Sequence, residues 1–222
     1  MTQETLHTAA SSSSTAPFVI EVDNLGKKFN HEWVFKKLTY TFSAGNIYAI
    51  TGPNGSGKST LLQILWGQMP PSAGEIKYTG GQGAVSMEAV FHHLAIATPY
   101  MDLIEEFTLE EQLNFHFRLK KCRPGLTPAM LPEKMNLGHA RHKYIGNFSS
   151  GMKQRLKLAL AFFTEADVLF LDEPGTNLDK PSFEWYREQL DNLSSHCLVY
   201  IASNQAEEYP VNSQKIDIMR YK

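Results

Sequence analysis

The 222-residue sequence has little of several features that define whole classes of protein. It has two cysteines, Cys122 and Cys197, which form no Cys-x-x-Cys pair, so neither a disulfide framework nor a cysteine metal site is expected. Its apolar runs, such as 158–163 and 168–171, are far shorter than the roughly 20 residues that cross a bilayer. Lysine and arginine number 21 against 23 aspartates and glutamates, so no broad basic surface for direct nucleic-acid binding is expected.

Residues 1–17 differ in composition from the rest of the chain. They are rich in serine and have neither a cationic start nor an apolar core, which predicts a disordered tail and argues against a secretory signal. Hydrophobic residues make up 42% of the whole chain and charged residues 20%, values typical of globular proteins. Residues 18–222 are therefore expected to form one domain, and a reducing cytosol is its simplest setting.

Hydrophobic periodicity predicts strands that alternate with helices. The first two strand patterns, 18–22 and 33–42, are separated by a break at 24–26 and indicate an antiparallel opening. Further strands are expected at 47–51, 75–78, 94–97, 166–171 and 198–202, with a closing edge strand at 216–220. Alternation of this kind predicts an α/β domain with a mostly parallel central sheet and a small N-terminal antiparallel β subdomain.

Helical patterns complete this order of elements. Leu61, Leu62 and Leu65 predict a helix over 58–67, and Thr108 with Glu111 has the spacing of a capping box. The further helical patterns are those of Leu109, Leu113 and Phe117; of Met152, Leu156, Ala159 and Phe163; and of Phe183, Tyr186, Leu190 and Leu193. The segment from about 105 to 165 is therefore expected to be a short, mostly helical subdomain. Its basic residues Lys153, Arg155 and Lys157 are expected on the solvated helix surface.

A phosphate-binding loop is predicted between the strand at 47–51 and the helix that follows it. The pattern G-x-x-x-x-G-K-[ST] is satisfied by Gly52, Pro53, Asn54, Gly55, Ser56, Gly57, Lys58 and Ser59, followed by Thr60. Glycines allow backbone conformations that turn successive N–H groups toward an anion, and the helix adds its positive end. Lys58 is expected at the β- and γ-phosphates, the Ser59 hydroxyl at Mg²⁺ and Thr60 at the α-phosphate. The chain is therefore expected to bind ATP with Mg²⁺.

Two carboxylates follow the apolar strand at 166–171. In a parallel sheet, Asp172 and Glu173 would lie at the carboxyl edge, beside the phosphates. Asp172 suits a direct or water-mediated role at Mg²⁺, whereas Glu173 can orient and deprotonate the attacking water. The pair predicts hydrolysis of the bound nucleotide.

The segment 148–155, Phe-Ser-Ser-Gly-Met-Lys-Gln-Arg, opens a helix between these two motifs. In this order it resembles the signature sequence of the ABC ATPases, and the resemblance covers about residues 18–222. The resemblance implies a P-loop NTPase fold of ABC type. It also implies a head-to-tail pair of domains in which Ser149, Ser150 and Gly151 bind the γ-phosphate held by the other domain. Ser150 replaces the family's first glycine and Met152 its glutamine.

Further site residues follow from the same resemblance. The stretch 175–179 looks like the D-loop, which places Asn177, Leu178 and Asp179 at the domain interface. Phe29 is similar to the aromatic residue on which adenine stacks.

Two positions depart from the family pattern. Tyr100 stands where the family carries a glutamine, and Asn204 stands where it carries a histidine. Asparagine can donate a hydrogen bond to the γ-phosphate, but it cannot take up a proton near neutral pH. Slow but measurable ATP turnover is expected.

The resemblance favours the ATP-binding subunit of an ABC transporter, pairing with a second copy on the cytoplasmic face of the membrane and driving separately encoded integral membrane subunits. Three alternatives stay open. A weakened cassette could regulate or pair with an active twin, and a soluble ABC ATPase could act on ribosomes or DNA. A nucleotide kinase would need an acceptor pocket and a mobile arginine-rich lid.

Overall fold

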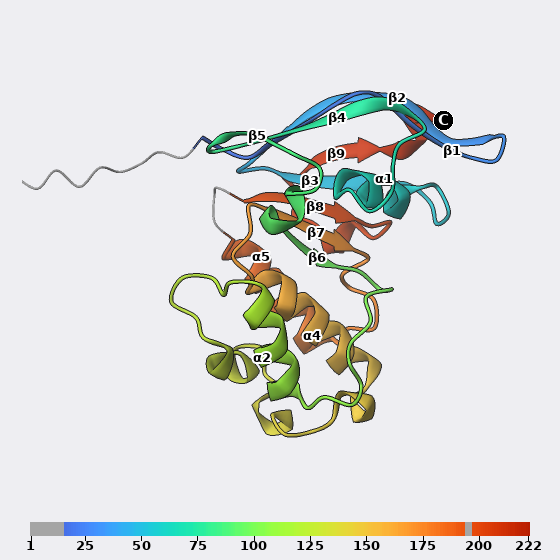
Figure 1. Ribbon diagram of the computed structural model, residues 1–222. Helices are drawn as coiled ribbons and strands as arrows, with labels where there is room; N and C mark the ends of the chain where they lie inside the picture. Colours follow the sequence, from blue (N-terminus) through green and yellow to red (C-terminus); the bar gives the residue numbers. More distant parts are fainter. Residues whose placement is uncertain (1–15, 194–196) are drawn as a thin grey trace, which may run out of the picture.

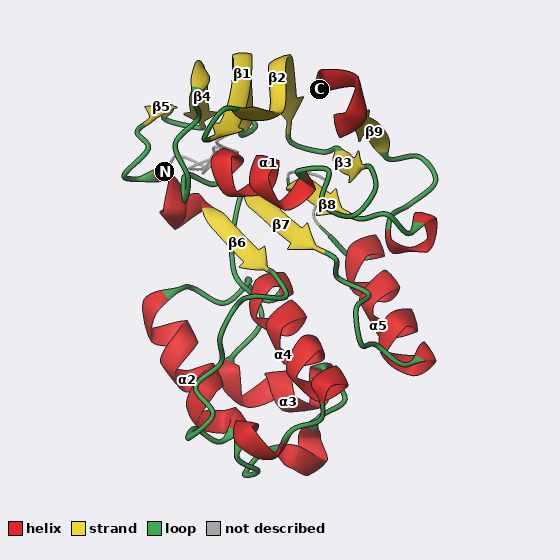
Figure 2. Ribbon diagram, turned by 90° about the vertical axis from the view of Figure 1, so that its right-hand side faces the viewer, coloured by secondary structure: helices red, strands yellow, loops and turns green. Residues whose placement is uncertain are grey.

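The computed structural model describes residues 16–193 and 197–222, so most of the predicted tail at 1–17 lies outside the described residues. Two sheets and a group of helices follow one another from top to bottom in Figure 1. Figure 2 shows the same three parts after a quarter turn. Among the described residues, no helix combines the length and the apolar character that spanning a bilayer requires.

The upper sheet is antiparallel and has the strand order β2-β1-β4-β5. Its strands are β1 (Val19–Phe29), β2 (Glu32–Ser43), β4 (Ala73–Gly80) and β5 (Gly83–Val85). The break expected at 24–26 is wrong, because β1 continues through it as a bulge. Asn24 adopts a φ of 53°, its N–H donates to Thr39 Oγ1 at 2.9 Å, and the register with β2 shifts between Val22 and Leu25.

The second sheet is wholly parallel and has the strand order β6-β7-β8-β3-β9. Its strands are β3 (Ile47–Thr51), β6 (Leu94–Ala97), β7 (Val168–Asp172), β8 (Leu198–Ala202) and β9 (Gln214–Asp217). Every residue of β7 and β8 is buried, as expected for strands covered on both faces. The closing strand lies at the sheet edge, but its expected range of 216–220 is wrong. Asp217 accepts a hydrogen bond from the Met219 N–H at 3.0 Å, and the chain turns into a 3₁₀ helix, η6 (Ile218–Tyr221).

Five α-helices lie among the described residues. They are α1 (Lys58–Leu65), α2 (Leu109–Leu119), α3 (Leu131–Lys134), α4 (Ser150–Phe162) and α5 (Lys180–Asp191). Of these, α2, α4 and α5 begin at side-chain caps. The capping box is confirmed, because Thr108 and Glu111 each accept a hydrogen bond from the other's backbone N–H. Between α2 and α4 the chain forms only α3 and three short 3₁₀ turns, η2 (Pro128–Met130), η3 (Gly138–Ala140) and η4 (Ile145–Asn147).

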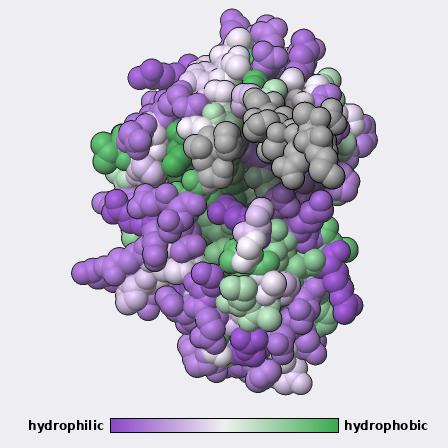
Figure 3. All heavy atoms as spheres, turned by 90° about the vertical axis from the view of Figure 1, so that its left-hand side faces the viewer, coloured by the Kyte–Doolittle hydropathy of each residue, from purple (hydrophilic) through white to green (hydrophobic). Residues whose placement is uncertain are grey.

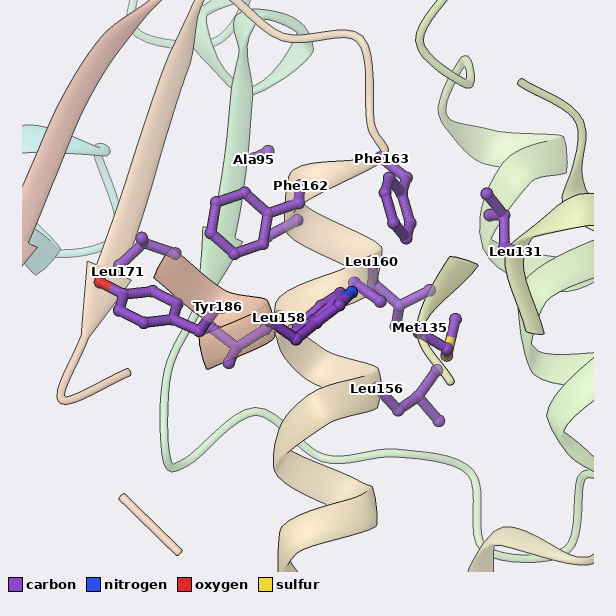
Figure 4. Packing of buried hydrophobic residues seen from close by; sticks show 14 of the residues in the cluster. Ala95, Leu131, Met135, Leu156, Leu158, Leu160, Phe162, Phe163, Leu171 and Tyr186 are labelled. Atoms are coloured by element: carbon purple, nitrogen blue, oxygen red, sulfur yellow. The ribbon is translucent and has the colours of Figure 1, made fainter. Parts of the chain in front are cut away.

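Two buried apolar clusters hold these parts together. One joins the antiparallel sheet to α1 and to one face of the parallel sheet, and includes the stacked rings of Phe170 and Tyr200, with centroids 4.7 Å apart. The other packs the opposite face against α4, α5 and the helical part; Figure 4 shows Leu158, Phe162 and Tyr186 at its centre. On the face in Figure 3, apolar side chains gather in a band between hydrophilic regions above and below.

Candidate functional site

The phosphate loop (residues 52–60) connects β3 to α1 at the carboxyl edge of the parallel sheet. Gly52, Gly55 and Gly57 have φ values of 145°, 75° and 105°, which side-chain-bearing residues rarely adopt. A Cβ at Gly57 would lie closer than 3.0 Å to Val34 Cγ1 on β2. Glycine is therefore required at Gly57 both by the backbone conformation and by the strand packed against the loop.

Lys58, the first residue of α1, lies across the phosphate loop. Its side chain is buried, and its Nζ donates to the carbonyl oxygens of Gly52 at 3.0 Å and Pro53 at 3.2 Å. These bonds hold the ammonium group inside the loop, where it can exchange carbonyl oxygens for phosphate oxygens. The hydroxyl of Ser56 is buried in the same loop and has no hydrogen-bond partner among the described residues.

Asp172 ends β7 beside the phosphate loop. It is 2% exposed, and its Oδ1 has no hydrogen-bond partner among the described residues. Burial raises the pKa of Asp172, while the Ser59 hydroxyl acts in the opposite direction by hydrogen bonding. A buried carboxylate oxygen and a neighbouring hydroxyl are the hard oxygen donors that Mg²⁺ prefers. The two residues therefore fit a magnesium ion.

Glu173 follows directly and has a different environment. Its φ of 45° is unusual for a residue with a side chain, and its backbone N–H donates to the Ala202 carbonyl oxygen at 2.9 Å. The side chain is only half-buried. The sharp turn separates the two carboxylates, leaving Asp172 inside the sheet edge and Glu173 at the solvent, where a water molecule can reach it.

Asn204 lies at the same sheet edge, after β8. Its Nδ2 donates to Asn54 Oδ1 of the phosphate loop at 2.9 Å, and the preceding Ser203 N–H donates to the Ile50 carbonyl oxygen at 3.1 Å. Residues from β3, β7 and β8 thus meet at one edge, because parallel strands end together. Their roles in ATP binding and hydrolysis stay predictions.

The signature segment (residues 148–155) contains the start of α4 and does not lie at this edge of the sheet. Ser149 caps the helix by accepting from the Met152 N–H at 3.2 Å, and Ser150 is exposed. In Figures 1 and 2, the start of α4 lies at the end of the helix that points away from the sheets. These donors are therefore not gathered around the chain's own phosphate loop.

The D-loop (residues 175–179) packs against this helix. A Cβ at Gly151 would lie 2.9 Å from the Asn177 carbonyl oxygen, so the two segments approach closely. Gln154 Nε2 donates to the Pro174 carbonyl oxygen at 3.0 Å, and Asp179 caps α5 by accepting from the Ser182 N–H at 3.0 Å.

The basic residues of α4 are not a solvated surface, so that expectation is wrong. The Arg155 side chain is 14% exposed; its guanidinium lies 3.5 Å from Asp179 Oδ1 and bonds to Ser182. Lys157 Nζ donates to the Pro99 carbonyl oxygen at 2.7 Å, and Lys153 pairs with Glu105. Helical spacing could not reveal these roles, because every partner lies at least 20 residues away along the chain.

Tyr100 and Phe29 both lie on the surface. The Tyr100 side chain is 81% exposed. Phe29 ends β1, is 48% exposed, and has Lys27 Nζ 5.3 Å from its ring centroid. The position of Phe29 leaves the ring free to stack on a base, which stays a prediction.

Known proteins share both the sequence pattern and the fold. The profile of the family described as "ABC transporter" matches residues 35–176. The Nod factor export ATP-binding protein I of Rhizobium johnstonii is 30% identical over 185 residues, covering 82% of this chain and 60% of that protein. The cytochrome c biogenesis ATP-binding export protein CcmA of Brucella abortus is 32% identical over 166 residues, covering 73% of this chain and 74% of that protein.

A solved structure shows the same fold. An ABC transporter ATP-binding protein from Pyrococcus furiosus superposes with a TM-score of 0.76 at 22% identity, covering 91% of this chain and 98% of that chain. The chain spans about 60% of the length of the Nod factor export relatives that it matches. The family profile and the CcmA match show that the chain belongs to the ABC transporter family, as an ATP-binding domain.

Proposed function

We propose that this chain binds ATP with Mg²⁺ and hydrolyses it slowly, and that closure of a pair of chains over the nucleotide drives integral membrane subunits. The observation that carries the proposal is the meeting of Lys58, Asp172, Glu173 and Asn204 around the phosphate loop. Sequence reasoning assigned these residues to one site from three separate strands.

Each residue has a distinct task at the bound nucleotide. Lys58 and the backbone N–H groups of the phosphate loop hold the β- and γ-phosphates. Ser59 and Asp172 would hold Mg²⁺, which would supply positive charge to the phosphate oxygens when bound. Glu173 takes a proton from water as the water oxygen bonds to the γ-phosphorus; the bond to the bridging oxygen breaks and ADP leaves. Asn204 can hydrogen-bond the γ-phosphate without accepting its proton, so slow turnover is expected.

The position of the signature segment supports pairing with a second copy. Ser149, Ser150 and the N-terminus of α4 form an anion site that faces away from the sheets, so the phosphate that it serves belongs to another chain. In such a pair Asn177, Leu178 and Asp179 lie at the interface.

An apolar cavity supports docking to membrane subunits on the cytoplasmic face. It has a volume of about 600 Å³ and lies between the end of α1, η1 (Val90–His93), β6 and the ends of α2 and α4. Phe91 and Met87 line it and are 54% and 41% exposed. We assign it to a cytoplasmic apolar segment of a membrane subunit, since the curated relatives are named export ATP-binding proteins. Phe91→Glu should abolish copurification with membranes but leave ATP binding intact; unchanged copurification would exclude this surface.

ATP turnover tests the assigned chemistry directly. Lys58→Ala should remove most ATP binding, with exposed Lys36→Ala as its control. Glu173→Gln should keep ATP binding and stop phosphate release, with exposed Glu184→Gln as its control. Hydrolysis by Glu173→Gln at the parent rate would refute the assigned base.

Pairing is tested in the Glu173→Gln background, where ATP should accumulate a dimer measurable by light scattering. Adding Ser149→Asp keeps a side-chain acceptor at the helix cap, so α4 should still form. The new carboxylate repels the γ-phosphate, so the dimer should be lost. A dimer that survives this change would exclude the signature segment as its phosphate site.

A second function, a regulatory cassette that binds ATP and pairs with an active twin, is favoured by the exposure of Tyr100 and by the asparagine at 204. The absence of phosphate release from the parent chain, with ATP binding intact, would select this alternative.

A further inference from the structure

A buried carboxylate that the hydrolytic scheme does not use lies near the D-loop. Glu208 ends the short 3₁₀ helix η5 (Ala206–Glu208), four residues after Asn204, and is 1% exposed. Its Oε1 accepts a hydrogen bond from the Gly175 N–H at 3.1 Å, whereas Oε2 has no hydrogen-bond partner among the described residues. Burying a carboxylate with one oxygen left without a hydrogen-bond partner is costly, so the burial of Glu208 requires a reason beyond packing.

We propose that Glu208 is a positioning residue for ATP hydrolysis, which couples the switch segment (residues 203–208) to the D-loop. The inference rests on the proposed function and adds a role that the phosphate-binding residues do not fill. Glu208 touches neither the phosphate loop nor the predicted nucleotide position. It acts through Gly175.

The first half of the coupling runs from the phosphate loop to Glu208. Asn204 bonds to Asn54 of the phosphate loop, as described above. The Ser203 hydroxyl accepts from the Gln205 N–H at 2.9 Å, and the Glu208 N–H donates to the Gln205 carbonyl oxygen at 3.2 Å. The switch segment is thus a tight, internally bonded turn, and a shift at Asn204 carries Glu208 with it.

The second half runs from Glu208 to the signature helix. Gly175 follows Pro174, whose carbonyl oxygen accepts from Gln154 of α4. A Cβ at Gly175 would lie closer than 3.0 Å to Glu208 Oε1, so only glycine lets the carboxylate approach this closely. The switch segment and α4 therefore bond to adjacent residues, Gly175 and Pro174.

A further contact holds the backbone of Glu208 in place. The Tyr186 hydroxyl of α5 donates to the Glu208 carbonyl oxygen at 2.6 Å. Burial raises the pKa of Glu208, the Ser203 hydroxyl and the Gly175 N–H lower it, and the charges of Glu173 and Glu207 raise it further. The charge of the assigned base Glu173 thus acts on the same group.

The experiment compares Glu208→Ala with Glu208→Gln and with Glu207→Ala, the control at an exposed neighbour. ATP binding is measured by calorimetry, and kcat and KM by phosphate release. Glu208→Ala should lower kcat at least tenfold and change Kd and KM less than threefold. Glu208→Gln should restore kcat to within threefold of the parent, because its amide oxygen accepts the Gly175 N–H. Equal losses in Kd and kcat, or no loss of kcat, would overturn the proposal.

Gly175→Ala changes the other partner of the same contact, so it tests the proposal even where Glu208→Ala fails to fold. Its methyl group should displace the carboxylate and lower kcat, and the double variant with Glu208→Ala should lose less than the product of the two single effects. Multiplicative effects would argue against direct coupling.

Amide hydrogen exchange separates this inference from the proposed function. Adding ATP should slow exchange in residues 174–179 of the parent chain and not of Glu208→Ala, whether or not phosphate is released. A parent chain without turnover refutes the hydrolysis proposal. Equal protection of these residues in both chains refutes the coupling.

Discussion

Gly57→Ala tests the most specific structural claim about the phosphate loop. The substitution adds one methyl group at a backbone φ of 105°, where it meets Val34 Cγ1 on the neighbouring strand β2. Gly57 is also the residue that precedes α1. A displacement of the loop therefore moves both the backbone N–H groups and the helix start that are predicted to hold the phosphates.

The expected size of the effect follows from two contributions. Holding alanine in this sparsely populated conformation costs about 1–3 kcal/mol. Inserting a methyl group against Val34, a β-branched residue on a paired strand, costs about a further 1–3 kcal/mol. If about 1.4 kcal/mol of this total is lost from the free energy of ATP binding, the affinity falls tenfold. We expect at least a tenfold rise in the Kd for ATP.

Calorimetric titration with Mg²⁺-ATP measures this effect, and thermal unfolding shows how much of the cost falls on stability. Gly55→Ala is the matched control, because its φ of 75° carries about 1–2 kcal/mol of backbone strain while the added Cβ meets nothing within 4 Å. Adding Val34→Ala to Gly57→Ala removes the steric part and should recover some of the affinity. Equal effects at Gly55 and Gly57, or no recovery in the double variant, would refute the assignment of the clash.

Three further predictions follow from named contacts. Asn204→His should raise the rate of phosphate release without tightening ATP binding, and an unchanged rate would show that proton uptake at this position does not limit turnover. Asp172→Asn should abolish Mg²⁺-dependent hydrolysis yet stabilise the nucleotide-free chain at neutral pH. Burial raises the pKa of Asp172, so the contribution of this carboxyl group to folding stability is lost as pH rises through that pKa. Urea unfolding should therefore show that the stability gained by Asp172→Asn shrinks as pH falls toward 3.8. His116, whose pKa burial lowers from 6.5 to about 4, should cost the chain about 1–3 kcal/mol of stability as pH falls from 6.5 to 4, and His116→Gln, which can still bond to Thr164, should flatten that decline.

Local sequence was sufficient to predict those features in which one short segment determines both the backbone conformation and the chemical groups. The glycine spacing of residues 52–60 fixes the turn of the phosphate loop because only glycine adopts those φ values readily. The capping box at Thr108 and the apolar strand before Asp172 are read in the same way. Parallel strands end at one edge, so the sequence also predicted that Asp172 and Glu173 lie at the carboxyl edge of the sheet. The structure shows that Asn204 follows the neighbouring strand β8.

Tertiary structure decided what depends on distant partners. Arg155 has the spacing of a surface residue, yet its side chain is only 14% exposed because Asp179 and Ser182 approach it from another element. Glu208 gives no local signal of its contact with Gly175, 33 residues away. Hydrophobic periodicity records which face of an element is buried, whereas the pairing of buried polar groups depends on how separate elements pack. The sequence by itself therefore determined the phosphate loop, the strand order along the chain and the family, and only the folded chain determined how the switch segment, the D-loop and the signature helix are joined.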